Sequence, residues 1–257
     1  MQRFTLVFLT VLSFTGFYAS VGQIRTGRPS HAEDRVIIQR HRIVLVRNAD
    51  VAKLFPNRRT AVVTYPVITG LNNPAVLRRI RLALEFKNIF DYSLKEYRDD
   101  PWLTEFNYVV DYNRNYLLDI TFTQSGMAAY PDEQHKHFLI SLKDGQIVTA
   151  QDVFESKKLN SLAAMVDREL QREIKRIAHE NRSPEEKEMV NGAYDSLKFE
   201  LKELDEFSIG PKGITFLYDA GFPHVIKAFE PRGKYFFTYS ELKSYIKRDG
   251  LLGQFIQ

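Results

Sequence analysis

The sequence predicts an α+β protein, an antiparallel meander of strands with helices packed on one face. Three observations point to this class. Several short segments alternate apolar and polar residues between turn residues, which is typical of strands that bury one side. Residues 158–180 instead place apolar residues at helical spacing. The 257 residues include no cysteine, so a hydrophobic core has to hold the chain together, as suits this length.

Residues 1–22 have the layout of a secretory signal peptide. Arg3 is followed by an apolar run with small hydroxyl residues, and Ser20 and Gly22 fit the small-residue positions before a cut. The alternative is an uncleaved anchor, since the apolar run is just long enough for a short membrane span. We expect an exported, periplasmic or extracellular protein that meets a membrane only if this segment stays uncleaved. A linker and N-terminal strands are expected over residues 23–59, and the main domain over residues 60–257.

The stretch "TYPVITGLNNPAVLRRI", residues 64–80, predicts a strand followed by a helix. β-Branched and aromatic residues indicate the strand, and Pro66 favours a place at the sheet edge. Asn73 is expected to cap the helix, with Pro74 at its first position, where a missing N–H costs nothing. Helical spacing then predicts a helix to about Asn88.

The strongest β signal follows in three segments. "FNYVVDY" alternates Phe106 and Tyr108 onto one face, and "YLLDITFTQ" places Leu118 and Ile120 opposite Asp119. "HFLISL" then runs into an Asp-Gly pair, a favoured hairpin turn. We therefore expect an antiparallel meander with one face in a core.

The C-terminal part is predicted to be helical and then β. Helices are expected over residues 158–180 and again after Ser183, followed by a hairpin through residues 210–213. "HVIKAF", residues 224–229, predicts a further strand. Thr238 with Glu241 three residues later forms a capping box before a short helix.

Composition and motifs exclude several function classes. The chain has 36 Lys and Arg against 32 Asp and Glu, a net charge of +4, and no run of basic residues stands out, so nucleic-acid binding is not expected. The chain has no P-loop, no Gly-x-Ser-x-Gly elbow and no His-Glu-x-x-His motif. We therefore expect a protein that is not an enzyme and carries no cofactor.

Five segments in order resemble an exported domain family, a domain of unknown function found in RsiV-like anti-sigma factors and in the N-terminal accessory region of PdaC-like peptidoglycan deacetylases. The segments are "TYPVITGLNNP", "VVDYNRNYLLDITF", "FLISLKDGQIVTAQDVF", "GITFLYDAG" and "YSELKSYI". The resemblance implies a two-lobed α+β module outside the cytoplasm. In the RsiV-like proteins it implies a sensor for lysozyme, and in the deacetylases an accessory domain.

The chain departs from this family in two ways. Tyr130 stands where family members often carry a His, so a role tied to that His is not carried over. The output parts are also not evident: only three residues precede the apolar run, where an anti-sigma factor needs a cytoplasmic region, and the sequence carries no deacetylase domain. These departures favour the sensing or accessory function alone.

Two sets of residues are candidates for a site. Tyr130, Trp102 and Tyr116 lie beside the predicted strands, where aromatic rings could form a binding platform for a glycan or a protein. His135 and His137 are two residues apart on a predicted strand, so they share a face, and a His pair near carboxylates can hold a metal ion. A polar strand whose solvent face carries two His explains the pair more simply.

We therefore expect a non-enzymatic cell-envelope binding or sensing module. Its partner would be a lysozyme-like envelope protein or a peptidoglycan-type glycan. The alternative is a metal-dependent hydrolase acting on envelope polymers through His135 and His137.

Overall fold

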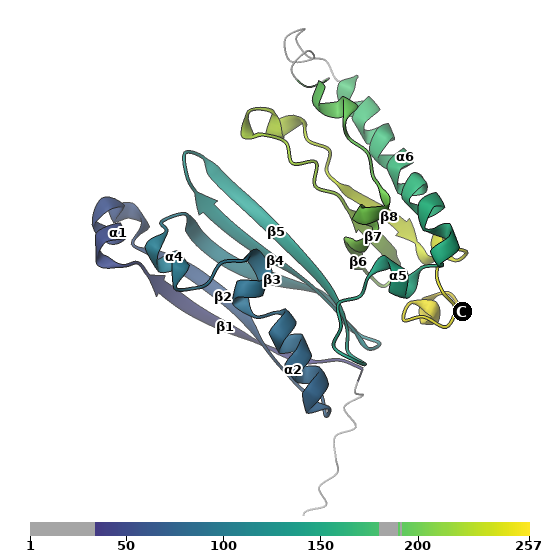
Figure 1. Cartoon of the computed structure of the whole chain (residues 1–257), viewed down its shortest axis with the longest axis horizontal. Helices are drawn as coiled ribbons and strands as arrows, with labels where there is room; N and C mark the ends of the chain where they lie inside the picture. Colours follow the sequence, from purple (N-terminus) through teal and green to yellow (C-terminus); the bar gives the residue numbers. More distant parts are fainter. Residues whose placement is uncertain (1–33, 180–189, 191) are drawn as a thin grey trace, which may run out of the picture. The chain divides into compact units, whose positions relative to one another are not determined.

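A computed structural model of the chain describes residues 34–179, 190 and 192–257, which belong to one compact unit (Figure 1). The predicted signal peptide, residues 23–33 of the predicted linker and the beginning of the helix predicted after Ser183 lie outside the described residues. The predicted α+β class is confirmed: there is one five-stranded and one three-stranded sheet, each with its own helices.

The five-stranded sheet has the order β1-β2-β3-β4-β5. Its members are β1 (Ile37–Val46), β2 (Thr60–Thr69), β3 (Leu103–Arg114), β4 (Leu117–Met127) and β5 (Pro131–Ser141). Neighbours are antiparallel except for β2 and β3, which pair in parallel at Val62 and Val63. The predicted meander is thus confirmed as β3–β4–β5. Its first turn uses Asn115 and Tyr116, both at positive φ, the backbone that a two-residue hairpin requires.

The prediction that Pro66 marks an edge strand is wrong, because β2 lies between β1 and β3. Pro66 is tolerated since β3 pairs with β2 only at Val62 and Val63. Beyond these residues β2 is paired on one side only, with β1. A missing N–H on the unpaired side costs no ladder hydrogen bond.

Helices cover one face of this sheet (Figure 1). They are α1 (Ala49–Leu54), η1 (Pro56–Arg58), α2 (Pro74–Ala83), α3 (Phe86–Phe90) and α4 (Glu96–Asp99). The predicted cap of α2 is confirmed, since the Asn73 side chain accepts the N–H groups of Ala75 and Val76 at 3.0 and 3.3 Å. The predicted end near Asn88 is wrong. Tyr65 donates its hydroxyl to the Leu84 carbonyl, and the backbone is extended at the next residue, so α2 ends at Ala83.

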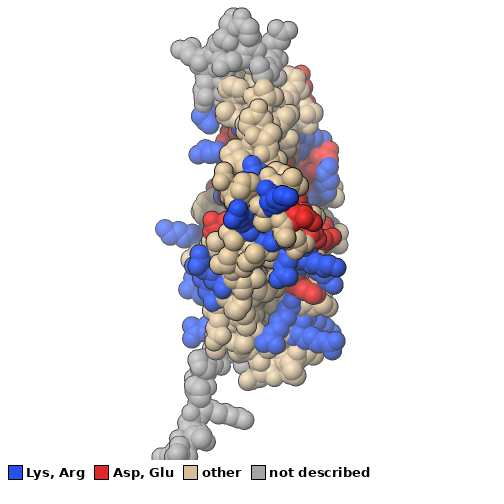
Figure 2. All heavy atoms as spheres, turned by 90° about the vertical axis from the view of Figure 1, so that its left-hand side faces the viewer, with Lys and Arg blue, Asp and Glu red and all other residues tan. Residues whose placement is uncertain are grey.

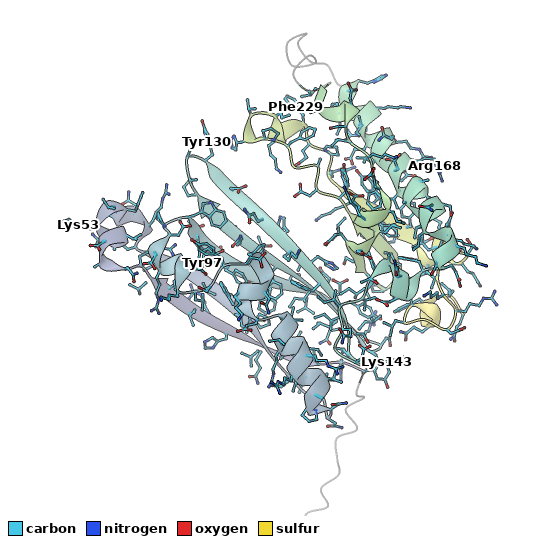
Figure 3. All side chains as sticks on the ribbon, viewed as in Figure 1. Lys53, Tyr97, Tyr130, Lys143, Arg168 and Phe229 are labelled. Carbon is cyan, nitrogen blue, oxygen red and sulfur yellow. The ribbon has the colours of Figure 1, made fainter. Side chains whose placement is uncertain are left out.

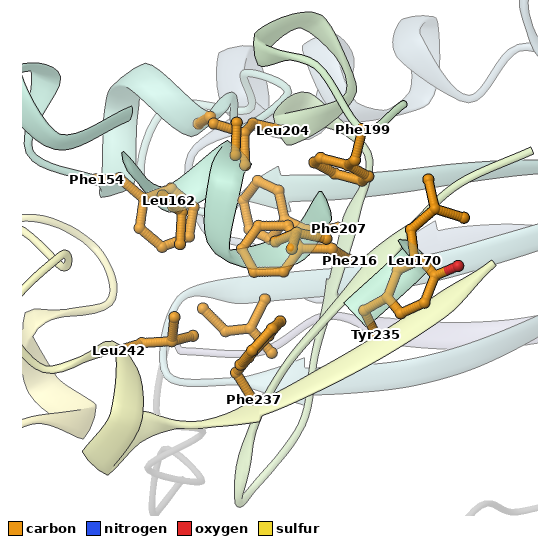
Figure 4. Close-up of a cluster of buried hydrophobic side chains, with 14 of the residues drawn as sticks. Phe154, Leu162, Leu170, Phe199, Leu204, Phe207, Phe216, Tyr235, Phe237 and Leu242 are labelled. Atoms are coloured by element: carbon orange, nitrogen blue, oxygen red, sulfur yellow. The ribbon is translucent and has the colours of Figure 1, made fainter. Parts of the chain in front are cut away.

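The three-stranded sheet has the order β6-β7-β8 and a separate core (Figure 4). Its strands are β6 (Phe207–Ile209), β7 (Gly213–Leu217) and β8 (Lys234–Thr238). The accompanying helices are α5 (Ala150–Val153), η2 (Ser156–Lys158), α6 (Leu159–Ala178), η3 (Leu201–Asp205), η4 (His224–Phe229), α8 (Tyr239–Leu242) and η5 (Gly253–Phe255). α6 buries its apolar stripe in this core, as predicted, and the capping box of Thr238 and Glu241 is confirmed.

The strand predicted over residues 224–229 is wrong, because these residues form the 3₁₀ helix η4. β7 already has β6 on one side and β8 on the other, so a further strand could not pair with β7. Pro223 and Pro231 flank the segment, and each lacks the N–H that a ladder needs. Only Ile226 of η4 is buried.

Candidate functional site

The sheet face away from α2 carries polar side chains from three neighbouring strands. Cross-strand register places Ser125 opposite both Glu105 and Glu133, and the next row places Thr123 opposite Asn107 and His135. We call this surface the polar face; it consists of Glu105, Asn107, Val109, Asp119, Thr121, Thr123, Ser125, Glu133, His135 and His137. The period of two in each strand produces it, since Leu118, Ile120 and Phe122 point into the opposite core.

One end of the polar face is buried by β6. Asp119 is fully buried, and its Oδ1 lies 2.6 Å from His137 Nε2. Its Oδ2 accepts the Ser208 hydroxyl at 2.9 Å and the Ile209 backbone N–H at 2.6 Å. The His137 side chain is only 5% exposed. We call these four residues the buried end; a carboxylate with this many donors is stable out of water and ties the two sheets together.

The other end is open to solvent and hydrogen-bonded on its own strands. Glu133 accepts the Ser125 hydroxyl at 3.0 Å and lies 3.1 Å from His135 Nε2. The Thr123 hydroxyl lies 3.0 Å from His135 Nδ1. The side chains of His135 and Glu133 are 59% and 55% exposed. Glu105, Asn107, Thr123, Ser125, Glu133 and His135 form what we call the open end.

A shallow hollow of about 240 Å³ lies over the open end. It is lined by Glu105, Asn107, Tyr108, Val109, Thr123, Ser125 and Glu133. Arg40 of β1 borders it, donating to Asn107 Oδ1 at 3.0 Å and lying 5.5 Å from the Tyr108 ring. Burial raises the pKa of Tyr108, and the nearby Arg40 opposes this shift. Acceptors, hydroxyls, an amide and an apolar side chain thus surround one small space.

A second hollow, of about 340 Å³, lies between α2 and the turn after β5. Its lining includes Arg79, Leu82 and Ile147 but no carboxylate and no His. Arg79 there donates to the Asp144 backbone carbonyl at 3.1 Å. The open end therefore offers the richer set of polar groups.

His135 and His137 do share a face, as the sequence predicted, but their surroundings differ. His137 faces Asp119 in the buried end, whereas both ring nitrogens of His135 have exposed partners on β4 and β5. Across the part of the chain that the structure describes, no group of three His, Cys, Asp or Glu is placed to hold a metal ion.

The three predicted aromatic residues are not brought together. Tyr116 and Tyr130 lie at opposite ends of β4, whose 11 residues span about 35 Å; Figure 3 shows Tyr130 at one tip and Lys143, which lies over the Tyr116 ring, at the other. Trp102 packs on Gly126, where an added Cβ would lie 2.2 Å from its ring. Tyr130 is 60% exposed and stacks on His224 with ring centroids 4.4 Å apart.

Sequence reasoning did not find Asp119, Glu105 or Ser125. The sequence does carry a sign that Asp119 is buried, because this carboxylate lies between Leu118 and Ile120 in the most apolar part of β4. A charge in such a run points to a buried partner. Glu105 and Ser125 become visible only through the register of β3 on β4.

The comparisons with known proteins concern the fold. No family model matches the chain, and no curated protein does. Several solved structures are similar to it, including the following two. One is a DUF3298 family protein from Bacteroides fragilis, with a TM-score of 0.52 and 11% identity, covering 86% of this chain and 97% of that one. The other is a DUF3298 family protein from Pseudomonas aeruginosa, with a TM-score of 0.53 and 10% identity, covering 83% and 94%.

These comparisons show that the chain has the α+β fold of two proteins from a domain family of unknown function. The finer resemblance to RsiV-like and PdaC-like proteins stays a prediction. No helix among the described residues is both long and apolar enough to cross a membrane.

Proposed function

We propose that this chain is a non-enzymatic, exported binding module of the cell envelope whose ligand occupies the open end of the polar face. The observation that carries the proposal is the hollow between Glu105, Ser125 and Glu133, where three adjacent strands present acceptors and hydroxyls to solvent. Strands hold these groups in fixed positions, as recognition requires. The ligand class is a protein or a wall glycan.

The shape of the open end supports binding over catalysis. The hollow is shallow, and Glu133 and His135 are more than half exposed, so the site does not exclude water from a reacting bond. A glycan would offer hydroxyls to the two carboxylates, and a protein would offer N–H groups or cationic side chains. Val109, 60% exposed beside the hollow, adds an apolar contact for either.

The alternative, a metal-dependent hydrolase using His135 and His137, has less support. His137 Nε2 is 2.6 Å from Asp119, which also holds β6. Recruiting both His to one metal would therefore break the buried end. Metal-dependent hydrolysis also requires an open coordination position in a shaped cavity.

Calorimetric titration tests the proposal. Residues 23–257 retain both hydrophobic cores, so this chain would be titrated with lysozyme, peptidoglycan fragments and zinc. We expect saturable heat with lysozyme or with a fragment. Zinc binding that is lost in His135→Ala/His137→Ala, together with hydrolysis of fragments, would overturn the proposal in favour of the hydrolase. The absence of binding heat with all three titrants would also count against the proposed binding function.

A further inference from the structure

The charge of this chain is strongly uneven. Residues 35–84, which form β1 to α2, carry ten basic residues and a single acidic one, Asp50. The ten are Arg35, Arg40, Arg42, Arg47, Lys53, Arg58, Arg59, Arg78, Arg79 and Arg81. This is a net +9 in a chain of net +4, so all other residues together carry −5. Figure 2 shows Lys and Arg side chains gathered over the side of the molecule that α1 and β1 form.

Among the described residues, no ion pair includes any of these ten basic side chains. Where their side chains donate hydrogen bonds, the acceptors are neutral. Arg47 and Arg58, for example, donate to backbone carbonyls of other segments. Arg47 is buried, and Asp100 lies near enough to act on its charge. The exposed members of the set direct their charge outward and attract anions.

Two exposed apolar side chains lie among basic residues at α1 and η1. Leu54 is 73% exposed and Phe55 40% exposed, at the junction of α1 and η1. Neither α1 nor η1 has a buried residue. Lys53 precedes the pair in sequence, and Arg58 and Arg59 follow it, with the Arg58 guanidinium 6.0 Å from the Phe55 ring. We call residues 53–59 the basic tip.

We propose that the basic tip and the adjoining edge of β1 bind the surface of an anionic lipid bilayer. The charges match the phosphate-rich headgroups, and Leu54 and Phe55 are placed to enter the boundary below them while the long basic side chains stay at the surface. A soluble anionic polymer would match the charges but would leave these apolar side chains in water. A bilayer is flat, so it needs no complementary groove.

This inference does not rest on the proposed function. No residue of the basic tip lines the hollow at the open end, and of the β1 residues only Arg40 borders it. The edge position of β1 explains part of the charge independently, since basic residues on an edge strand discourage pairing with other chains. That explanation does not account for the exposed Leu54 and Phe55.

Vesicle co-sedimentation tests the proposal with residues 23–257. Vesicles of equal parts phosphatidylglycerol and phosphatidylcholine should bind the chain, and vesicles of phosphatidylcholine alone should not. Arg42→Gln/Lys53→Gln/Arg59→Gln should weaken binding about 100-fold, because each basic residue near an anionic surface contributes about fivefold. The matched control, Lys157→Gln/Arg168→Gln/Lys175→Gln, removes three exposed charges elsewhere and should bind like the unchanged chain.

A second variant separates a bilayer from a soluble polyanion. Leu54→Ser/Phe55→Ser should lose about tenfold or more of the vesicle binding and leave binding to soluble polyphosphate unchanged. The proposal is overturned if no vesicle binds, if both vesicle types bind equally, or if the charge control loses as much as the basic-tip variant. Vesicle binding insensitive to Leu54→Ser/Phe55→Ser would overturn the bilayer in favour of an anionic polymer. Circular dichroism would verify that each variant is folded.

Discussion

The two ends of the polar face use the same strands and similar side chains but have opposite surroundings. At the buried end, β6 covers Asp119 and His137, and the carboxylate accepts from Ser208 and from the Ile209 backbone. At the open end, Glu133 and His135 make longer contacts within β4 and β5, and both side chains are more than half exposed. Thus a carboxylate–histidine pair links the two sheets where another strand covers it and stays exposed to solvent where none does.

Breaking the buried end should have the largest effect. Asp119→Ala removes the acceptor of three donors from two sheets, and breaking a buried charged network costs about 3–5 kcal/mol. We expect a loss of that size in the free energy of unfolding, measured by urea denaturation. The isosteric change Asp119→Asn should cost less because it retains an acceptor. A loss below about 1 kcal/mol for Asp119→Ala would contradict a structural role for this carboxylate.

The core beneath the open end should be the next most sensitive. A Cβ at Gly126 would lie 2.2 Å from the Trp102 ring, and overpacking of this kind costs about 1–3 kcal/mol. Gly126→Ala should therefore destabilise the chain and shift the fluorescence of its single Trp. Gly192→Ala is the control, since nothing lies within 4 Å of its added Cβ. Equal stability of the two variants would show that Trp102 moves aside freely.

Alkaline pH should lower the stability of the same core, because it contains buried tyrosines. Burial is the main cause that raises the pKa of Tyr65 and of Tyr97 to about 12, whereas an unfolded Tyr titrates near 10. Their contribution to stability is therefore complete below about pH 10 and is lost as the pH rises towards 12. Urea denaturation across this range should show a falling free energy of unfolding, and Tyr65→Phe should reduce the slope. A flat profile would contradict the raised pKa values.

Changes at the open end should affect stability least. His135→Ala removes an exposed side chain whose partners can turn to water, so we expect the free energy of unfolding to change by less than about 0.5 kcal/mol. His137→Ala, two residues away, should cost several times more. Similar losses for both variants would mean that the two ends do not differ as described.

The sequence predicted the strands of the meander well because alternation is a local property. It did not predict the burial of Asp119, whose donors Ser208 and Ile209 lie 89 and 90 residues further along the chain. The 3₁₀-helical conformation of residues 224–229 also depends on a later segment of the sequence, because β8 occupies the place beside β7.

The candidate site could be predicted only in part. The shared face of His135 and His137 followed from their spacing, whereas Glu105 and Ser125 required the register of β3 on β4. The prediction that Tyr130, Trp102 and Tyr116 form one aromatic platform was wrong, because the length of β4 separates Tyr116 from Tyr130. The uneven charge of residues 35–84 was present in the sequence, but the small net charge of the whole chain hid it.

The most direct test of the binding account compares two matched variants in the calorimeter. Glu105→Gln/Glu133→Gln changes the open end, and Glu155→Gln/Glu206→Gln removes two exposed carboxylates that lie outside the hollow. Each variant would be titrated with the lysozyme or peptidoglycan fragment that binds the unchanged chain. We predict that the open-end variant loses at least tenfold in affinity for this ligand at an unchanged melting temperature, while the control variant binds like the unchanged chain. Equal affinity of the two variants would contradict it.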